Sequence, residues 1–329
     1  MKIAIIGAGW VGCHLTKNLS EQGHDITLFE EKGIFSSTSF YNQNRLHLGF
    51  HYPRNYRTRL LCKETFDKFE NEYGEFTEIV NRNIYSIPDR SMIDYGTFKA
   101  VMSYDRVDFE EVEVEGLLNL EGSVLTGEKY INFQSIKTYF EDLLKDKLVY
   151  KKIENVNEIS SDFDFVINCT NNALKNEEIP AYYEAALSLI YTKIGETNFD
   201  SLTLMDGNFF SIYPYVPEKN LYTLTDVEYT PLYTNESIGK IDLFLKAITK
   251  DYINSIRLDM EEKVKTYFPQ FEDHFRFNDW FTSIKVKTYN QSADRYPIIS
   301  VNRNVISCFT GKIQGIYIIE NKIKEILKK

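Results

Sequence analysis

The amino-terminal segment alternates between apolar runs and a helical stripe. Residues 2–6 form a short, almost continuously apolar run, which is typical of a parallel strand buried on both faces. Apolar Val11, Leu15 and Leu19 then recur at helical spacing, and a second strand is expected over residues 25–29. This order predicts a β-α-β unit at the start of a parallel sheet.

Further along the chain the pattern changes from helical to alternating. Helical periodicity appears near residues 56–73, 133–146 and 239–266. Residues 202–228 are aromatic-rich and alternate between apolar and polar positions, and residues 276–289 add another strand. The middle of the chain therefore predicts a mostly antiparallel sheet.

The carboxy-terminal segment repeats the order of strand, turn and helix. A short apolar strand is expected over residues 306–309, and Gly311 precedes a helix. One apolar stripe marks that helix: Ile313, Ile316, Ile319, Ile323 and Ile326. Two interpretations follow from these residues alone. The turn offers N–H groups to a ligand, or the segment is an ordinary amphipathic helix with its turn.

A glycine-rich turn lies between the first strand and the first helix. Gly7 permits the tight turn, Gly9 lets the backbone approach a pyrophosphate, and Gly12 lets the helix pack against the strand. Glu30 ends the second strand, where a carboxylate accepts the ribose hydroxyls and disfavours a 2′-phosphate. The order predicts binding of FAD or NAD and not NADP. The alternative is a glycine-rich turn that binds nothing.

Composition limits the partners of the chain. The chain has 329 residues, enough for about two domains. Its formal net charge is 38 − 48 = −10, which argues against nucleic acid or an anionic membrane surface as a partner. The aromatic load of 23 Phe, 23 Tyr and 2 Trp predicts a heavily packed core or, alternatively, a stacking surface for a ring.

Cysteine spacing and apolar runs bear on the compartment. Cys13, Cys62, Cys169 and Cys308 are far apart and lack metal-ligand spacing, so we expect buried reduced thiols and no metal site. No apolar run approaches the ~18 residues that cross a bilayer, so no membrane insertion is expected. These observations favour a cytoplasmic protein.

Residues 36–53 are too polar and too irregular for a strand or a helix, so we expect a long loop. A long loop directly after a nucleotide-binding unit is commonly functional. This loop contains Arg45, His47 and His51, whose side chains can bind anions or accept protons.

The sequence resembles the D-amino-acid oxidase (DAO) superfamily of flavoproteins, nearest to its L-2-hydroxyglutarate oxidase branch. The resemblance covers most of the chain, in five segments: the fingerprint from Gly7 to Glu30, the loop from Asn42 through His47-Leu48-Gly49 to Tyr52-Pro53 with Cys62 further on, the later core strand 164–170, the substrate-domain strand 205–215, and the closing segment 294–299 with Gly311-Lys312. The chain departs from the family by having few glycines in the closing segment. It also has Cys169-Thr170-Asn171 where the family usually has Ala-Gly.

The resemblance implies an α/β (α+β) fold, in which a Rossmann-like FAD-binding domain with a parallel central sheet is interleaved with a mostly antiparallel substrate domain. The FAD-binding domain would take residues 1–75, 132–175 and 285–329, and the substrate or cap domain residues 76–131 and 176–284. The resemblance also implies a set of FAD-binding residues: Gly7, Gly9, Trp10, Val11, Gly12, Glu30, Glu31, Asn44, Arg45, His47, Cys169, Thr170, Gly311, Lys312 and Ile313.

Two histidines and two arginines are the candidates for chemistry. His47 and His51 can accept a proton near neutral pH, although histidines that pack a loop are the alternative. Arg45 and Arg295 can clamp a carboxylate or phosphate, with a surface or inter-domain salt bridge as the alternative. No role is expected for the remaining histidines, which we place on helix or turn surfaces: His14, His24 and His274.

We therefore expect an FAD-dependent oxidase or dehydrogenase that acts on a small polar substrate. It would remove a hydride from a CH–OH or CH–NH carbon of a 2-hydroxy acid, an amino acid or a sugar derivative. Two alternatives remain open: a redox-neutral flavoprotein isomerase resembling UDP-galactopyranose mutase, and a non-catalytic dinucleotide-binding module. The sequence does not identify the electron acceptor.

Overall fold

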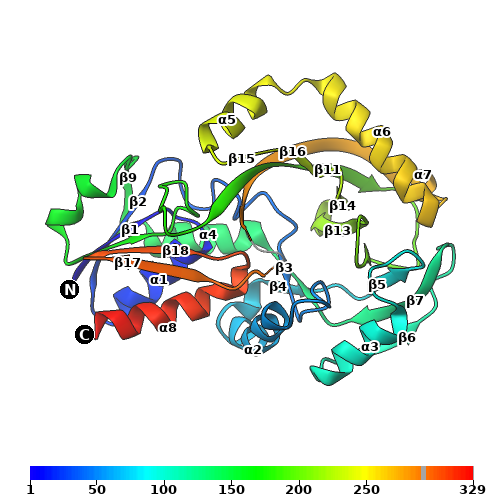
Figure 1. Cartoon of the computed structure of the whole chain (residues 1–329), viewed down its shortest axis with the longest axis horizontal. Helices are drawn as coiled ribbons and strands as arrows, with labels where there is room; N and C mark the ends of the chain where they lie inside the picture. Colours follow the sequence, from blue (N-terminus) through cyan, green and yellow to red (C-terminus); the bar gives the residue numbers. More distant parts are fainter. Residues whose placement is uncertain (290–293, 329) are drawn as a thin grey trace.

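A largely parallel sheet forms the half of the molecule that holds both chain termini (Figure 1). The computed structural model describes residues 1–289 and 294–328, and within these residues the sheet has six strands. They lie in the order β17 (Ile298–Asn302), β18 (Val305–Phe309), β10 (Phe165–Asn168), β1 (Lys2–Ile6), β2 (Asp25–Glu30) and β9 (Leu148–Tyr150). Only β17 at the edge runs antiparallel to its neighbour. The predicted β-α-β unit and the closing strand are confirmed.

Alternate residues of β1 pack on opposite faces of this sheet. Ile3 and Ile5 contact the helical side, whereas Ala4 and Ile6 contact the segment that contains Ile153. The helical side is covered by α1 (Trp10–Glu21), α4 (Phe133–Leu144) and α8 (Ile316–Leu327). Burial on both faces explains why residues 3–6 are all apolar rather than alternately apolar and polar.

A mostly antiparallel sheet forms the other half of the molecule (Figure 1). It contains nine strands among the described residues, and eight of them follow one path: β15 (Pro231–Asn235), β11 (Ala181–Lys193), β14 (Leu221–Asp226), β13 (Phe210–Val216), β12 (Ser201–Leu204), β5 (Asn83–Pro88), β7 (Leu120–Thr126) and β6 (Phe109–Val112). The ninth strand, β16 (Phe275–Thr288), pairs with β11. The expected hairpins over 202–228 and the expected strand over 276–289 are confirmed.

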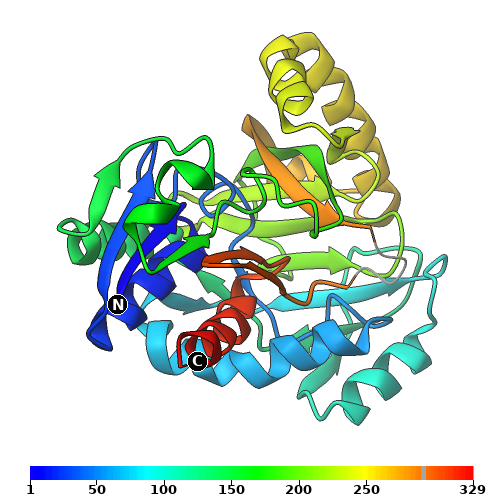
Figure 2. The same ribbon diagram turned by 60° about the vertical axis from the view of Figure 1, so that its left-hand side comes forward.

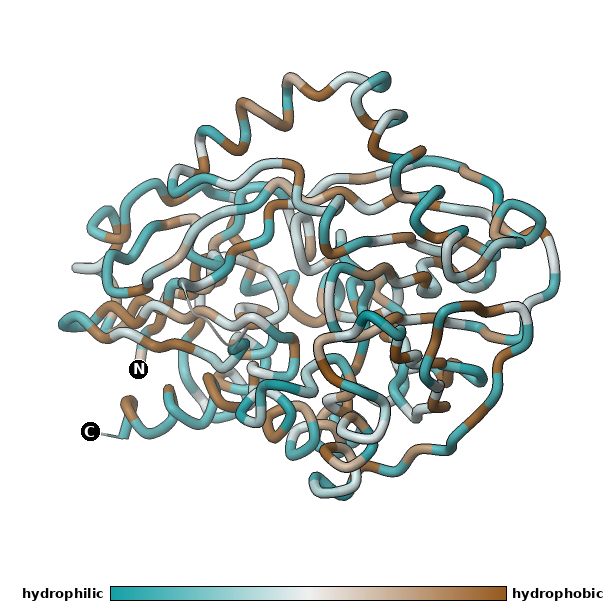
Figure 3. The backbone as a smooth tube through the Cα atoms, turned by 45° about the vertical axis from the view of Figure 1, so that its right-hand side comes forward, coloured by the Kyte–Doolittle hydropathy of each residue, from teal (hydrophilic) through white to brown (hydrophobic). Residues whose placement is uncertain are grey.

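Helices lie on the outside of this second sheet (Figure 1). They are α3 (Tyr95–Tyr104), α5 (Ile238–Ala247), α6 (Lys250–Tyr267) and the short α7 (Phe271–His274). The single helical pattern over 239–266 divides into two helices, because Ile248 is extended and Thr249 caps α6 by accepting a hydrogen bond from the Tyr252 N–H. Along the outer helices the hydropathy changes every few residues, as expected for helices with one buried face (Figure 3).

A small sheet and one long helix lie between the two halves. The strands of the small sheet lie in the order β3 (Arg45–Leu46), β8 (Lys129–Ile131) and β4 (Thr77–Ile79). They place the loop of residues 36–53, from here on called the functional loop, against the chain that leaves the second sheet. Helix α2 (Tyr56–Tyr73) lies beside α8 (Figure 2), where the Tyr317 hydroxyl donates to the Lys68 carbonyl. Short 3₁₀ segments complete the structure: Gly74–Phe76, Val156–Glu158, Ser160–Asp162, Pro217–Lys219 and Ile313–Gly315.

The sheets confirm the fold class, a parallel α/β unit joined to a mostly antiparallel one. The six-stranded sheet collects strands from three separate stretches of the chain, as expected for interleaved units. The exact residue limits of the domains stay a prediction. Within the described residues, no helix is both long and apolar enough to cross a membrane.

Two smaller expectations about single residues have different outcomes. All four cysteines are free and buried, which confirms the prediction for the thiols. The prediction that His14 lies on a surface is wrong. Its ring is fully buried and hydrogen-bonded to the Tyr73 hydroxyl at 2.8 Å, because α1 is covered by both α2 and α8.

Candidate active site

The turn after β1 needs its glycines because a Cβ atom at these positions would collide with neighbouring atoms. Gly7 has φ +98°, and a Cβ there would lie 2.9 Å from the Cys169 carbonyl oxygen. A Cβ on Gly12 would lie 1.8 Å from the Gly7 carbonyl oxygen, and one on Gly9 would lie 2.8 Å from the Ser39 hydroxyl. The strand, the helix and the loop therefore approach one another at van der Waals limits, so none of these three positions has room for a side chain. The backbone stays partly exposed at Gly7 and Gly9.

Glu30 lies directly against this turn. One carboxylate oxygen accepts from the Ala8 N–H at 2.9 Å, and the other accepts from the N–H groups of Glu31 and Lys32. Helix α1 begins after Gly9 without a side-chain cap, and the Trp10 N–H donates to the Ser39 hydroxyl. The acid and the helix start expected from the fingerprint are thus adjacent in space.

The other predicted FAD-binding residues of this region fall into two groups. The Trp10 ring points into the core and packs against Phe35 at 5.0 Å, so only its backbone faces the turn. Val11 packs against the same core. By contrast, Glu31 is exposed at the surface, and Asn44 is buried in a left-handed conformation with φ 49°.

Cys169 and Thr170 follow β10 and lie beside Gly7. The Cys169 N–H donates to the Ile6 carbonyl at 2.8 Å, and the Thr170 Cα is 3.2 Å from the position a Gly7 Cβ would take. The Thr170 hydroxyl donates to the Asn168 side chain at 2.7 Å, which shapes the turn. The structure therefore brings this predicted segment to the glycine turn, although it lacks the family's Ala-Gly.

Arg45 is a buried cation surrounded by neutral groups. It is 5% exposed, and its guanidinium donates to the hydroxyls of Tyr85, Thr203 and Ser211. The guanidinium carbon also lies 3.8 Å from the centre of the Tyr213 ring. No carboxylate of the described residues forms a salt bridge with it, and its Nε has no hydrogen-bond partner among them. The Glu128 carboxylate, which accepts from the same Tyr85 hydroxyl and whose pKa Arg45 helps to lower, supplies a partial counter-charge but does not contact the guanidinium. A buried guanidinium without a direct carboxylate partner favours an anionic ligand.

Glu128 is a buried carboxylate that the sequence analysis did not single out. One oxygen accepts from His47 Nδ1 at 3.1 Å and from the Tyr85 hydroxyl at 2.6 Å. The other accepts from the backbone N–H groups of Leu48 and Gly49. Burial alone would raise the pKa of Glu128, but the charge and hydrogen bond of His47 and the hydrogen bond of Tyr85 lower it to about 2.

Both ring nitrogens of His47 are engaged. Lys312 Nζ lies 2.9 Å from Nε2, and an ammonium can only donate, so Nε2 must accept. Nδ1 then carries the proton and donates to Glu128. Burial, with the Lys312 charge as the next cause, lowers the pKa of His47 to about 4, so the ring is neutral at physiological pH.

His51 differs from His47 in having a free nitrogen. Its Nδ1 is buried and has no hydrogen-bond partner among the described residues. Its ring lies 5.6 Å from the His47 ring and 5.3 Å from the Tyr52 ring. Burial, followed by the electrostatic effects of His47, Lys312 and Arg45, lowers the pKa of His51 well below its usual value. The structure thus places a neutral, unpartnered imidazole beside a set of cations.

The closing segment reaches the same place from the first sheet. A Cβ on Gly311 would lie 2.8 Å from the Arg295 side chain, so these two residues are in contact. Gln314 is buried and donates to the carbonyl groups of His47 and Cys62 at 2.7 and 2.9 Å. Residue 314 therefore fixes the start of the last helix against the functional loop. The predicted Ile313 begins the 3₁₀ turn in between.

Cations are in excess where these segments meet. Burial lowers the pKa of Lys285, on β16, to about 8, and although Glu184 opposes this, the charges of Lys287, Arg295 and Lys312 act in the same direction as burial. Arg295 also contributes to the lowered pKa of His51. The predicted candidates Arg45, His47, His51 and Arg295 are thus within electrostatic reach of one another, through His51.

Sequence reasoning missed Glu128, Gln314, Tyr85 and Lys285. Glu128, Tyr85 and Gln314 reach the site through hydrogen bonds to residues at least 40 positions away, and Lys285 through the electrostatic effects of Arg295 and Lys312. The pattern of the chain predicted a strand over Lys285 and the start of the last helix near Gln314, but no element at Tyr85. Nothing in the sequence distinguished Glu128 from the other acids.

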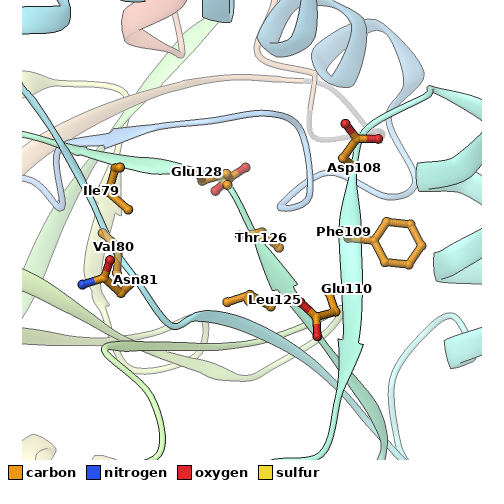
Figure 4. Close-up of a pocket in the computed structure, with 10 residues that line it drawn as sticks. Ile79, Val80, Asn81, Asp108, Phe109, Glu110, Leu125, Thr126 and Glu128 are labelled. Carbon is orange, nitrogen blue, oxygen red and sulfur yellow. The ribbon is translucent and has the colours of Figure 1, made fainter.

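A hollow of about 350 Å³ lies next to this site but does not contain the histidines (Figure 4). Strand ends of the second sheet and the small sheet line it, with Phe109 and Glu110 on one side and Leu125 and Thr126 on another. Of its lining residues, only Glu128 belongs to the polar network described above. The hollow is therefore a neighbour of the site rather than its substrate pocket.

The residues present fit FAD. The glycine turn is partly exposed at Gly7 and Gly9, it leads into a helix whose N-cap residue is a glycine, and Glu30 is next to it. Among the described residues, nine buried side-chain polar atoms have no hydrogen-bond partner, and five of them belong to the predicted loop, the segment after β10 or strand β13: Asn44 Oδ1, Arg45 Nε, His51 Nδ1, Asn172 Nδ2 and Tyr213 Oη. Buried polar atoms normally have partners, so these atoms are candidates for contacts with a ligand.

Comparisons with known proteins agree with this geometry. The family model for FAD-dependent oxidoreductases (DAO) matches residues 2–95. The FAD-dependent monooxygenase FPY4 of Fusarium mangiferae is 32% identical over 338 residues, which cover 99% of this chain and 90% of that protein.

Solved structures show the same fold. Glycine oxidase from Geobacillus kaustophilus matches with a TM-score of 0.73 at 10% identity, covering 99% of this chain and 94% of that one. The amino acid oxidase NikD matches with a TM-score of 0.73 at 11% identity, covering 97% and 91%. The predicted sub-branch stays a prediction, but family and cofactor are confirmed: the chain belongs to the FAD-dependent oxidoreductases of the DAO family.

Proposed function

We propose that this protein uses FAD to oxidise a CH–NH or CH–OH carbon of a small substrate that carries a carboxylate. The observation that carries the proposal is the buried Arg45, which has no carboxylate partner in the described residues and lies near the neutral His51. A carboxylate on the substrate would give the guanidinium a direct bidentate partner, which Glu128 does not. 2-Hydroxy acids and amino acids both meet this description.

FAD would be held by backbone and by one acid. The turn Gly7–Gly12 and the start of α1 would face its pyrophosphate, Glu30 its ribose, and the segments Cys169–Thr170 and Gly311–Ile313 its remaining parts. When bound, FAD supplies an acceptor for the hydride. The protein must then orient the carbon, hold the carboxylate and accept the proton.

His51 is the better proton acceptor of the two histidines. A base needs a neutral ring with a free lone pair, and His51, as its Nε2–H tautomer, would offer one on Nδ1, which has no hydrogen-bond partner among the described residues. His47 is neutral too, but its Nε2 accepts from Lys312 and its Nδ1 donates to Glu128. We therefore assign proton acceptance to His51 and a positioning role to His47.

Arg45 and Arg295 would take different parts in binding. Arg45 is fixed by three hydroxyls and by the Tyr213 ring, so it meets a carboxylate in one orientation. Arg295 packs on Gly311 and adds positive charge near His51. Together they explain why the site would prefer an anion although the whole chain carries a net charge of −10.

The relatives support an oxidation and also favour a second candidate. NikD and the Geobacillus protein are named amino acid oxidase and glycine oxidase, whereas the Fusarium protein is named a monooxygenase. Monooxygenation would place one atom of O₂ in the product, while oxidation would not. Turnover under ¹⁸O₂ followed by mass spectrometry of the product separates the two.

One experiment tests the proposal against its alternatives. FAD-loaded protein is mixed anaerobically with panels of 2-hydroxy acids, amino acids and sugars while the flavin absorbance is recorded. Bleaching by a carboxylate-bearing substrate supports the proposal. Turnover that requires prior reduction with dithionite would indicate the isomerase, and bleaching by neutral sugars alone would remove the carboxylate from the account.

A further inference from the structure

We propose that Glu128 is a positioning residue that acts through His47 to hold the Lys312 ammonium in the active site. Glu128 lies just before β8, His47 in the functional loop and Lys312 in the closing segment. The two hydrogen bonds Glu128–His47 and His47–Lys312 therefore join three distant parts of the chain. The expected effect on turnover rests on the proposed function. The arrangement of the three side chains does not.

The Glu128 carboxylate is saturated with donors. Its four hydrogen bonds come from His47 Nδ1, the Tyr85 hydroxyl and the N–H groups of Leu48 and Gly49. Three of these donors belong to consecutive residues of the functional loop. The side chain is fully buried, so no water competes for these acceptor sites. The carboxylate therefore fixes both the loop backbone and the orientation of the His47 ring.

The hydrogen bond to Glu128 determines which His47 nitrogen can accept a hydrogen bond from Lys312. Because Nδ1–H donates to Glu128, the neutral ring presents an unprotonated Nε2 on its other side. Lys312 donates to that nitrogen at 2.9 Å. The opposite tautomer would direct an N–H at the ammonium and remove this contact. The position of the Lys312 nitrogen therefore depends on the carboxylate two links away.

Lys312 is otherwise held only loosely by the described side chains. Its nitrogen lies 4.7 Å from the centre of the Tyr52 ring, a cation–π contact that restricts direction weakly. Its residue sits between Gly311 and Ile313, in the segment proposed to bind FAD. An ammonium fixed there faces the same space as Arg45 and Arg295, whose charges also reach His51. Glu128 is the buried carboxylate that offsets this positive charge on the His47 side.

The sequence offers a matched control for Glu128. Glu110 lines the same hollow as Glu128 (Figure 4), but it is exposed and takes no part in the network around His47. Glu128→Gln and Glu110→Gln remove the same charge from the same hollow. Glutamine at 128 keeps one acceptor oxygen but turns an NH₂ group toward donors, so half of the carboxylate's bonds are lost.

The decisive measurement is the ¹⁵N spectrum of the histidine rings in FAD-free protein. The chain has five histidines, and the His47 signals are assigned by their loss in His47→Gln. Wild type and Glu110→Gln should show His47 as the Nδ1–H tautomer, whereas Glu128→Gln should show mixed tautomers. An unchanged His47 spectrum in Glu128→Gln overturns the proposal, whether or not any substrate is found.

A second variant keeps the proposal testable if Glu128→Gln fails to fold. Lys312→Met removes the ammonium and leaves Glu128 in place. It should shift the Nε2 resonance of His47 while the Nδ1–H tautomer persists. If the Nε2 resonance stays where it is in wild type, Lys312 is not bound to His47, and Glu128 cannot position Lys312 through His47.

Kinetics then separate a positioning role from a structural one. Glu128→Gln should lower kcat by on the order of 10- to 100-fold, because a small displacement of an active-site group has effects of this size. KM should change less than twofold, since Arg45 keeps its contacts with the Thr203 and Ser211 hydroxyls, which do not involve Glu128. In a His47→Gln background Glu128→Gln should add little further loss of kcat. Equal and additive losses in both backgrounds would overturn the route through His47.

Discussion

At the scale of single residues, the two histidines of the functional loop differ by one free nitrogen. His51 Nδ1 has no partner among the described residues, whereas both nitrogens of His47 are bound. His51→Asn should therefore slow anaerobic flavin reduction by about 100-fold or more, the usual size of general-base effects, with FAD occupancy unchanged. Stopped-flow absorbance measures the rate. A larger loss in His47→Asn than in His51→Asn would reverse the assignment.

The lowered pKa of His51 also sets the acid limit of activity. The ring must be neutral to accept a proton, and its pKa lies well below the usual 6.5. The acid limb of the kcat/KM profile should therefore lie below pH 6.5. A limb at or above that pH, measured with the best substrate, would show that His51 is not the group that titrates.

Arg45 can be tested by the charge of the substrate. Arg45→Met keeps much of the side-chain volume but removes the cation, so KM for a carboxylate substrate should rise by about 100-fold or more, because a charge-assisted pair is lost in a buried site. The uncharged amide of the same substrate should be bound no worse than by wild type. Arg276→Met, at an exposed position of β16, is the matched control. An equal rise for acid and amide would assign Arg45 to packing.

The same buried groups make folding sensitive to acid. His47 has a folded pKa of about 4 against an ordinary 6.5, so its contribution to stability is present above pH 6.5 and is lost as the pH falls through 4. Glu128 has a folded pKa of about 2, so its contribution is lost between its ordinary value and pH 2. The denaturant midpoint of FAD-free protein should fall from pH 7 to pH 4. His47→Gln should show a flatter profile, and an equal slope in the two proteins would contradict this origin.

At the scale of elements, the turn between β1 and α1 is determined by space. Gly12→Ala would place a Cβ 1.8 Å from the Gly7 carbonyl oxygen, and backbone cannot move aside without displacing the helix. We expect the free energy of unfolding to fall by about 3 kcal/mol or more, together with loss of bound FAD. Gly74→Ala has nothing within 4 Å and a helical φ of −62°, so it should leave both unchanged. Normal flavin content in Gly12→Ala would contradict the close approach.

Elements with a strong period could be predicted from the sequence, and contacts between them could not. The strand at residues 2–6, the helix at 56–73 and the strand at 306–309 follow from local pattern and are confirmed within a residue or so. The division between α5 and α6 was missed because Ile248 interrupts the helix without interrupting its apolar stripe. The periodicity of apolar residues does not reveal the extended Ile248 or the N-cap Thr249 that separates the two helices.

Only part of the candidate site could be predicted from the sequence. Arg45, His47 and His51 were found because they share one polar loop with a family resemblance. Glu128 and Gln314 were missed, since their importance comes only from the donors and carbonyl groups that the fold brings to them. The sequence gives no sign that one acid among 48 acidic residues is buried.

At the scale of the whole molecule, the site forms where the two halves meet. Hydroxyl groups from β5, β12 and β13 of the antiparallel sheet hold Arg45, while Lys312 and Gln314 follow the last strand of the parallel one. A chain of net charge −10 thus contains a site rich in cations. Positive charge at this site raises the local concentration of small anions although the chain as a whole is negative.

The central claim is that bound FAD accepts a hydride from a carboxylate-bearing substrate held by Arg45. The most direct measurement is anaerobic flavin bleaching by matched pairs of acids and amides, with wild type and Arg45→Met compared side by side. We predict bleaching of the wild type by at least one 2-hydroxy acid or amino acid, slower by about 100-fold or more with its amide, and no such preference in the variant. Bleaching of both proteins at equal rates by acid and amide would contradict the account.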